Sequence, residues 1–194
     1  MAGFLDDVAD MVRSPFFREI EVSELKAGDH IYCGRKLSFV YTHHGIYIGD
    51  GKVIHNMGKN GSGKKKACKS RPQCGYDGRG GLVETCVECF RATSGFLTGT
   101  KLYLFLYGVP KLECEIRLRA YCSPKQSKPA DEVVAKAKEM LESKKQGGTR
   151  YGFFFNNCED FATLCKTGTA FCTQSELLFG RVGYPILKQL VQSS

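Results

Sequence analysis

The sequence contains no apolar run near the roughly 20 residues that a membrane-spanning helix needs. Its longest apolar candidate, Leu102–Tyr107, has the length of a single strand. The first residues lack the basic start and the apolar stretch of a secretory signal, and Gly is not the second residue, so the myristoylation pattern is missing as well. No internal repeat and no nucleic-acid-binding signature is present. We therefore expect a cytoplasmic protein that has no nucleic-acid partner.

The composition is that of an ordinary globular protein. The 194 residues, of which 42% are hydrophobic and 25% charged, suit one domain. The net charge of +8 is concentrated in residues 59–79, where seven Lys and Arg side chains accompany a single acid, Asp77. This basic segment favours contact with an anionic membrane surface, and a solvated loop explains it equally well. The residues most suited to membrane contact are Lys64, Lys65, Lys66 and Lys69.

Short strands are expected in the first half of the chain. Two of them, His43–Gly49 and Lys52–Asn56, flank Asp50-Gly51, which is a strong hairpin signal. Residues 57–100 are rich in Gly, Lys and Cys and are expected to form a long excursion from the fold. The other expected strands are His30–Cys33, Leu102–Tyr107 and Glu115–Ala120.

Helices are expected mainly in the second half of the chain. One begins after Pro129 and ends at Gly147-Gly148, and a second runs from Asn157 to Gly168. Residues 4–12 and 175–191 also have helical patterns. We divide the chain into an N-terminal amphipathic segment (1–21), a main domain (22–168) and a C-terminal extension (169–194).

Cys158 lies at or just inside the start of the helix expected after Asn157. The free backbone N–H groups and the dipole at a helix N-terminus favour a thiolate. A nucleophilic thiolate needs a base, normally histidine, and three of the four histidines lie in or beside the hairpin. The alternative from spacing alone is that Cys158 is a small buried hydrophobic residue and the histidines are ordinary strand residues.

The register of the hairpin decides between these two interpretations. A plain two-residue turn would place His43 and His55 on opposite faces of the sheet. A three-residue loop, Gly49-Asp50-Gly51, with a glycine bulge would place His55 opposite Gly45 and bring His43 to the same face. We predict the bulged register, because it alone directs two imidazoles toward one thiol.

Three blocks of sequence resemble the lecithin:retinol acyltransferase domain, a family that includes the HRAS-like suppressor enzymes. The blocks are Leu25–Tyr32, Tyr41–His55 and Asn157–Phe161, in the family's order. The last block and the cysteine-rich insert look most like the plant branch, which includes LEAD-SENSITIVE-like proteins. The resemblance implies an α+β fold, a circularly permuted papain-like arrangement of the NlpC superfamily with an antiparallel sheet packed on helices.

The resemblance also implies a role for each matching residue. By motif position, His43 resembles the general base, His55 the residue that orients it, and Cys158 the nucleophile. Tyr41 and Asn157 resemble residues that help to bind the oxyanion or to support the site. His30 and His44 have no catalytic counterpart and are expected to be structural.

The implied reaction is acyl transfer from a phospholipid or other acyl ester through an acyl-Cys158 intermediate, without a metal or organic cofactor in the chemistry. Two departures stand out. Asp160 occupies a position where animal members often have histidine, and the hydrophobic C-terminal anchor of many animal members has no counterpart before Ser194. A lipid enzyme would then dock by another surface, for which residues 59–79 are the candidate. A catalytically quiet interaction module and a cysteine peptidase or amidase are the alternatives.

Four cysteines of the insert have a spacing that suggests a metal site. Cys86 and Cys89 form a Cys-x2-Cys half-site, whereas Cys68 and Cys74 are more loosely spaced. Structural zinc, disulfides and free thiols are the three interpretations. Zinc would cross-link an excursion that has few apolar residues of its own. The remaining cysteines are expected to be buried without pairing: Cys33, Cys114, Cys122, Cys165 and Cys172.

Overall fold

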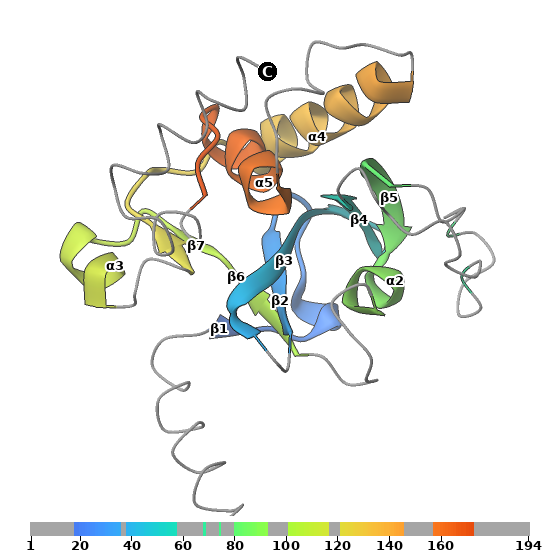
Figure 1. The fold of residues 1–194 in the computed structure, drawn as a ribbon. Coiled ribbons are helices and arrows are strands. Elements are labelled where there is room, and N and C mark those ends of the chain that lie inside the picture. Colours follow the sequence, from blue (N-terminus) through green and yellow to red (C-terminus); the bar gives the residue numbers. More distant parts are fainter. Residues whose placement is uncertain are drawn as a thin grey trace, which may run out of the picture.

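A six-stranded sheet organises the computed structural model, with its strands in the order β1-β6-β2-β3-β4-β5 (Figure 1). All the pairings within this sheet are antiparallel. The strands are β1 (Arg18–Glu19), β2 (His30–Arg35), β3 (Ser38–Gly49), β4 (Lys52–Asn56), β5 (Leu82–Cys86) and β6 (Leu102–Leu104). The structure describes residues 18–35, 38–57, 68, 74, 80–92, 101–116, 121–145 and 157–172.

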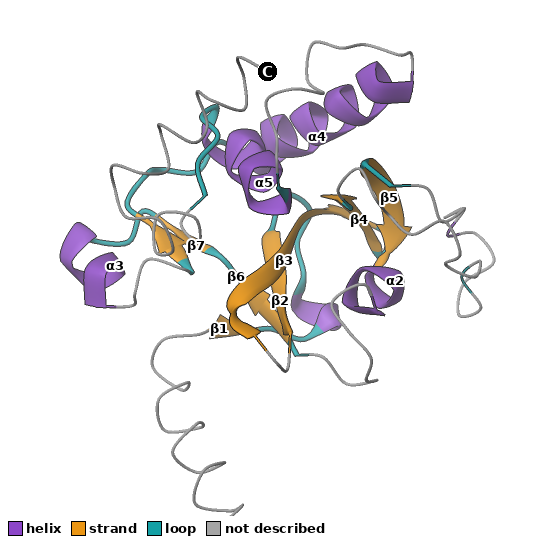
Figure 2. Cartoon of the chain, in the orientation of Figure 1, coloured by secondary structure: helices purple, strands orange, loops and turns teal. Residues whose placement is uncertain are grey.

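Helices cover both faces of the sheet (Figure 2). Helices α4 (Ala130–Lys145) and α5 (Cys158–Thr167) pack on one face, and the short α2 (Val87–Ala92) packs on the other. The described residues also form the 3-10 helix η1 (Val22–Glu24), the helix α3 (Lys111–Ile116) and a small parallel pair of strands, β7 (Leu106–Tyr107) and β8 (Cys122–Ser123). The fold class predicted from the sequence, α+β with a mostly antiparallel sheet, is therefore confirmed.

The β3–β4 hairpin places alternate residues in two different cores. Ile46 and Ile54 pack with α4 and α5, in a cluster that includes Phe161. Their neighbours Tyr47 and Val53 pack on the opposite face with Val87 and Phe90, which belong to α2. This alternation follows from the two-residue period of a strand, and it commits each hairpin residue to one face.

The hairpin has the register predicted from the bulge. Gly45 is paired with His55 and Tyr47 with Val53. The way in which the chain produces this register differs from the predicted three-residue loop. A two-residue turn, with Asp50 at φ 52° and Gly51 at φ 68°, closes the Gly49–Lys52 pair, and the extra residue is Ile48 on β3. Positive φ at both central residues suits a turn whose twist matches the strands, and the bulge then shifts the register by one residue.

The ends of α5 follow local signals. The Asn157 side chain accepts a hydrogen bond from the Asp160 backbone N–H at 2.8 Å, which caps the helix. Gly168 ends the helix in the left-handed conformation, at φ 78°. The predicted helix from Asn157 to Gly168 is thus confirmed, and Cys158 is its first residue.

Two strand predictions need correction. Residues 115 and 116 of the predicted strand Glu115–Ala120 belong to α3, and residues 117–120 lie outside the described residues. The helix follows Pro110, which presets a helical φ and whose carbonyl accepts the Cys114 N–H. The predicted strand Leu102–Tyr107 is interrupted at Phe105, whose N–H binds the His30 carbonyl. The two halves, β6 and β7, therefore join different sheets.

The expected excursion at 57–100 is also wrong in part, because residues 82–86 form β5 and extend the main sheet beside β4. The helices expected at 4–12 and 175–191 and the four lysines at 64, 65, 66 and 69 lie outside the described residues. Among the helices of the described residues, none has the length and apolar character to cross a bilayer.

Gly45→Ala tests the packing that this register creates. A Cβ at Gly45 would lie 2.7 Å from Val53 Cγ1 and 2.9 Å from Phe90 Cε2, so we expect a loss of about 1–3 kcal/mol in the free energy of unfolding. Gly34→Ala is the matched control, because a Cβ there meets nothing within 4 Å. Urea denaturation of both variants measures the difference; equal stabilities would contradict the register.

Candidate active site and cysteine cluster

Two buried histidines meet on the α2 face of the hairpin. His43 Nε2 lies 2.8 Å from His55 Nδ1, and their rings are nearly perpendicular, with an interplanar angle of 86°. His43 is 6% exposed and His55 is fully buried. Gly45, directly opposite His55, leaves room for Val53 Cγ1, Phe90 Cε2 and the Cβ of His55 to approach its backbone. The register therefore produces the pair that the sequence analysis required.

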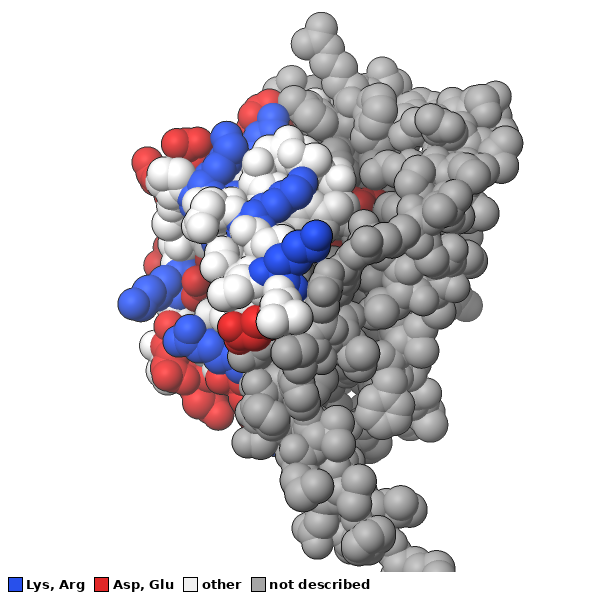
Figure 3. Space-filling model, turned by 90° about the vertical axis from the view of Figure 1, so that its left-hand side faces the viewer, with Lys and Arg blue, Asp and Glu red and all other residues white. Residues whose placement is uncertain are grey.

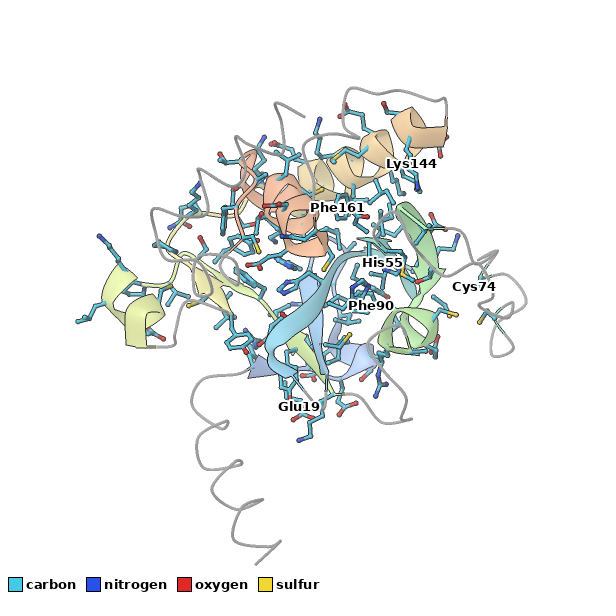
Figure 4. The ribbon with its side chains drawn as sticks, in the orientation of Figure 1. Glu19, His55, Cys74, Phe90, Lys144 and Phe161 are labelled. Atoms are coloured by element: carbon cyan, nitrogen blue, oxygen red, sulfur yellow. The ribbon has the colours of Figure 1, made fainter. Side chains whose placement is uncertain are left out.

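Helix α2 and strand β5 hold this histidine pair from the outside. The Phe90 ring lies 5.0 Å from the His43 ring and 5.1 Å from the His55 ring, measured between centroids. Thr85 Oγ1 lies 3.0 Å from His55 Nε2. Figure 4 shows His55 and Phe90 side by side, with Phe161 on the α5 side of the hairpin.

The hydrogen bonds give the pair a direction. The Thr85 hydroxyl donates to the Cys86 carbonyl at 3.1 Å, so its oxygen accepts from His55 Nε2–H. His55 Nδ1 then carries no proton and accepts from His43 Nε2–H. In the neutral pair this leaves the lone pair of His43 on Nδ1. The chain of bonds thus selects the His43 nitrogen that can act as a base.

The Cys158 thiol lies against the β3 backbone on both sides of His43. Its Sγ accepts a hydrogen bond from the His44 N–H at 3.3 Å and lies 3.7 Å from the Thr42 carbonyl oxygen, to which the thiol donates. Cys158 is 2% exposed. The last pair between β3 and β4 is Gly45–His55, so Thr42 and His44, which the thiol contacts, lie beyond the paired part of β4. The first residue of α5 thereby contacts the backbone on either side of His43, the predicted base.

A second histidine pair occupies the other face of β3. His30 Nε2 lies 2.8 Å from His44 Nδ1, His30 Nδ1 lies 2.8 Å from the Tyr107 hydroxyl, and His44 Nε2 lies 2.6 Å from Thr42 Oγ1. Burial, followed by the nearby His43, lowers the pKa of His44 to about 3, and burial together with His44 also lowers the pKa of His30. Both rings are therefore neutral near pH 7, as expected of structural residues.

Four cysteine sulfurs gather at the outer side of β5 and α2. The Sγ atoms of the four residues lie within 4.8 Å of one another, and those of Cys68 and Cys86 are 3.6 Å apart. In a tetrahedral zinc–thiolate site, with Zn–S bonds of about 2.3 Å, neighbouring sulfurs are about 3.8 Å apart. This four-cysteine cluster thus has the donor set and the spacing for a metal ion. Its members are Cys68, Cys74, Cys86 and Cys89.

Backbone groups and protonation also bear on the four-cysteine cluster. The Cys86 N–H donates to Cys74 Sγ at 3.1 Å, and the Cys89 N–H donates to Cys86 Sγ at 3.4 Å. Without a metal, burial raises the pKa of Cys86 to about 12 and raises that of Cys89 as well. A bound cation would replace the thiol protons, so metal binding would release them.

Residues 23–171 match the family model described as lecithin retinol acyltransferase. The chain belongs to the lecithin retinol acyltransferase family. Protein LEAD-SENSITIVE 1 of Arabidopsis thaliana is 36% identical over 164 residues, which cover 76% of this chain and 60% of that protein. The lecithin retinol acyltransferases of Bos taurus and Homo sapiens are each 26% identical, over 80% and 86% of this chain. The chain spans 60% to 64% of the length of these relatives.

The structure brings together most of the residues that the sequence predicted for the site. The rings of His43 and His55 are hydrogen-bonded to each other. Cys158 contacts the backbone beside His43, and Asn157 caps the helix that Cys158 begins. Tyr41 belongs to β3, but its side chain lies outside the described residues. None of the ten cysteines forms a disulfide, and the five that were expected to be buried are buried. Two of these five are neighbours, because the Cys122 thiol donates to Cys114 Sγ at 2.9 Å.

Sequence reasoning missed two residues of the site, Thr85 and Phe90. Each directly neighbours a cysteine of the Cys-x2-Cys half-site, Thr85 before Cys86 and Phe90 after Cys89. That adjacency was the only available signal. Their contact with the histidines depends on the pairing of β5 with β4, which the sequence patterns did not predict.

The neutral His30–His44 pair predicts an acid-sensitive fold. Because the folded pKa values lie below the unfolded value near 6.5, the unfolded chain binds more protons, and stability falls as the pH drops from about 6.5 toward 3. Each such histidine contributes a slope of at most about 1.4 kcal/mol per pH unit. His44→Asn should reduce this slope in urea denaturation between pH 7 and pH 4. An unchanged slope would show that His44 is not held neutral.

Proposed function

We propose that this chain transfers acyl groups from a phospholipid, or a related ester, through a covalent acyl-Cys158 intermediate. Membership of the family indicates acyltransferase-type chemistry. The observation that supports the mechanism best is the contact of Cys158 Sγ with the backbone on both sides of His43, whose ring is in turn hydrogen-bonded to His55. A thiol, a base and a residue that orients the base are the minimum for thiol acyl transfer.

The proposed first half of the reaction forms the acyl-enzyme. His43 Nδ1 takes the thiol proton, and Sγ attacks the ester carbonyl carbon. Developing positive charge on His43 is shared with His55 through their hydrogen bond, which also keeps the ring oriented. Backbone N–H groups at the start of α5 stabilise the oxyanion, with Tyr41 and Asn157 as further candidates. When the C–O bond breaks, His43 returns the proton to the leaving alkoxide.

In the second half, the acyl group leaves Cys158. Water that attacks the thioester gives phospholipase A1/A2-type hydrolysis, whereas an amine or an alcohol gives N- or O-acyl transfer. In each case His43 removes a proton from the acceptor, and the thiol is regenerated. None of these steps needs a metal ion or an organic cofactor.

The proposed docking surface for lipid is the basic segment at residues 59–79. On the face in Figure 3, Lys and Arg side chains of the described residues are interspersed with Asp and Glu, so no patch of one sign forms there. Four lysines of the basic segment would attract anionic headgroups: Lys64, Lys65, Lys66 and Lys69. We accordingly propose a cytoplasmic protein in peripheral contact with an anionic membrane.

The second candidate function is a catalytically quiet interaction module. It is favoured by the near-complete burial of the reacting groups, 2% exposed for Cys158 and 6% for His43. A peptidase or amidase has no such observation in its favour. We also propose that the fold is the circularly permuted papain-like arrangement, because the histidine strands β3 and β4 precede the cysteine helix α5 along the chain.

We further propose that the four-cysteine cluster holds a structural zinc ion, which would cross-link β5 and α2 to the segment of Cys68 and Cys74. No step of the acyl transfer involves this ion.

Intact-protein mass spectrometry after exposure to mixed-chain phospholipid vesicles tests the acyl-enzyme. We expect the mass of one acyl group on Cys158, no such increment in Cys158→Ala, and a rate of acylation about 10²–10⁴-fold lower in His43→Gln, which lacks the base. Cys165→Ser is the matched control, because Cys165 lies on the same helix but in the apolar core. Acylation of Cys158→Ala at the wild-type level would refute the mechanism, and no acylation of any variant would favour the quiet module.

Metal analysis of protein purified without oxidant or chelator tests the zinc site. We expect about one zinc equivalent, lost in Cys89→Ser and retained in Cys114→Ser, whose thiol lies in α3. Less than about 0.3 equivalents in the wild type would count against the site.

A further inference from the structure

We propose that the four-cysteine cluster, with its metal bound, sets the orientation and the tautomer of the His43–His55 pair, acting through Thr85 and Phe90 as positioning residues. This inference rests on the proposed zinc site and on the proposed roles of the two histidines. It goes beyond both, because it makes the metal centre a control on the base of the active site rather than a clamp on a remote loop.

The first connection is a chain of hydrogen bonds that starts at a metal ligand. Cys86 offers its sulfur to the four-cysteine cluster and its carbonyl oxygen to the Thr85 hydroxyl. The position of that carbonyl keeps the Thr85 proton pointing away from His55. Thr85 Oγ1 can then only accept from His55 Nε2–H, at 3.0 Å. His55 Nδ1 is left to accept from His43 Nε2–H, which places the basic lone pair on His43 Nδ1.

The second connection is mechanical. Phe90 directly follows the ligand Cys89, is fully buried, and packs on the rings of both His43 and His55. Its helix, α2, has six residues, too few to be stable by their own hydrogen bonds. Two proposed ligands, Cys86 before the helix and Cys89 within it, would fix α2 in place when a metal joins them to Cys68 and Cys74.

Loss of the metal would act on both connections together. With four thiol groups in place of a metal–thiolate centre, the fixed distances between Cys86 and Cys89 are relaxed. The Cys86 carbonyl and the Phe90 ring are then free to shift, and the Thr85 hydroxyl can turn to donate to His55. A hydroxyl that donates to His55 Nε2 leaves the proton of His55 on Nδ1, and His43 Nε2 must then accept it. That reversal removes the lone pair from His43 Nδ1.

The second histidine pair is a control within the same molecule. His30 and His44 lie on the opposite face of β3, and their bonds run to Tyr107 and Thr42, neither of which belongs to β5 or α2. A change limited to the four-cysteine cluster should therefore leave this pair unaffected. General unfolding would change both pairs.

Long-range proton–nitrogen NMR spectra of the histidine rings test the proposal without any activity measurement. Zinc-loaded protein should show His43 and His55 as single Nε2–H tautomers. Removal of zinc with a chelator, verified by metal analysis, should abolish the single-tautomer pattern of His43 and His55. The signals of His30 and His44 should stay unchanged. Added zinc chloride should restore the original pattern.

Variants of Thr85 distinguish the effect of its hydroxyl group from the effect of the metal. Thr85→Val has nearly the same shape but no hydroxyl, so it should retain zinc and yet lose the single-tautomer pattern of His55. Thr85→Ser keeps the hydroxyl and should restore the pattern. A loss of zinc in Thr85→Val would show that the residue serves the metal site instead, and would overturn its positioning role.

The contrary outcomes are distinct. Unchanged spectra after verified loss of zinc, equal changes in all four histidines, or failure of the protein to bind zinc would each overturn the proposal. If the spectra change as expected while Cys158 is never acylated, the coupling stands and only the proposed enzymatic function fails.

Discussion

The pairing of Gly45 with His55 is the constraint on which the site depends. A strand reverses its faces with each residue, so a shift of one position would send His43 and His55 to opposite sides of the sheet. The Ile48 bulge supplies that one-residue correction, and Gly45 lets Val53, Phe90 and the Cβ of His55 pack closely on β3. One extra residue in β3 therefore decides whether the two imidazoles lie on one face of the sheet, where they are hydrogen-bonded.

The same hairpin places two histidine pairs on opposite faces of the sheet, where they have different hydrogen-bond partners. His30 and His44 are fully buried, held neutral and bonded to hydroxyl groups, so they support the fold. His43 and His55 lie among groups from β5 and α2, which carry two members of the four-cysteine cluster. Cys158 contacts the backbone on both sides of His43, through the Thr42 carbonyl and the His44 N–H, while its helix packs on the core around Phe161.

The parts of the structure that local chemistry determines were predictable from the sequence. Asp50-Gly51 predicted the hairpin, and Asn157 and Gly168 predicted the ends of α5, because turns and caps depend on a few adjacent residues. The bulge was predicted only by requiring two histidines to share a face. The family followed from three motif blocks and is confirmed by the match over residues 23–171.

Features that depend on distant partners were not predictable in this way. The apolar run Leu102–Tyr107 carries no local sign of its interruption at Phe105, which follows from the pairing of β6 with β2 and of β7 with β8. Likewise, the roles of Thr85 and Phe90 arise from the placement of β5 beside β4. Short alternating patterns such as Glu115–Ala120 fit a strand and a helical turn equally well, and the first two residues of this pattern belong to α3, which follows Pro110.

The hydrogen bond between the two imidazoles is the central claim, and a nitrogen–nitrogen coupling transmitted through that bond measures it directly in labelled protein. We expect a coupling between His43 Nε2 and His55 Nδ1, with the proton on His43. A spectrum in which neither nitrogen is coupled to the other ring, in protein whose sheet is intact, would contradict it.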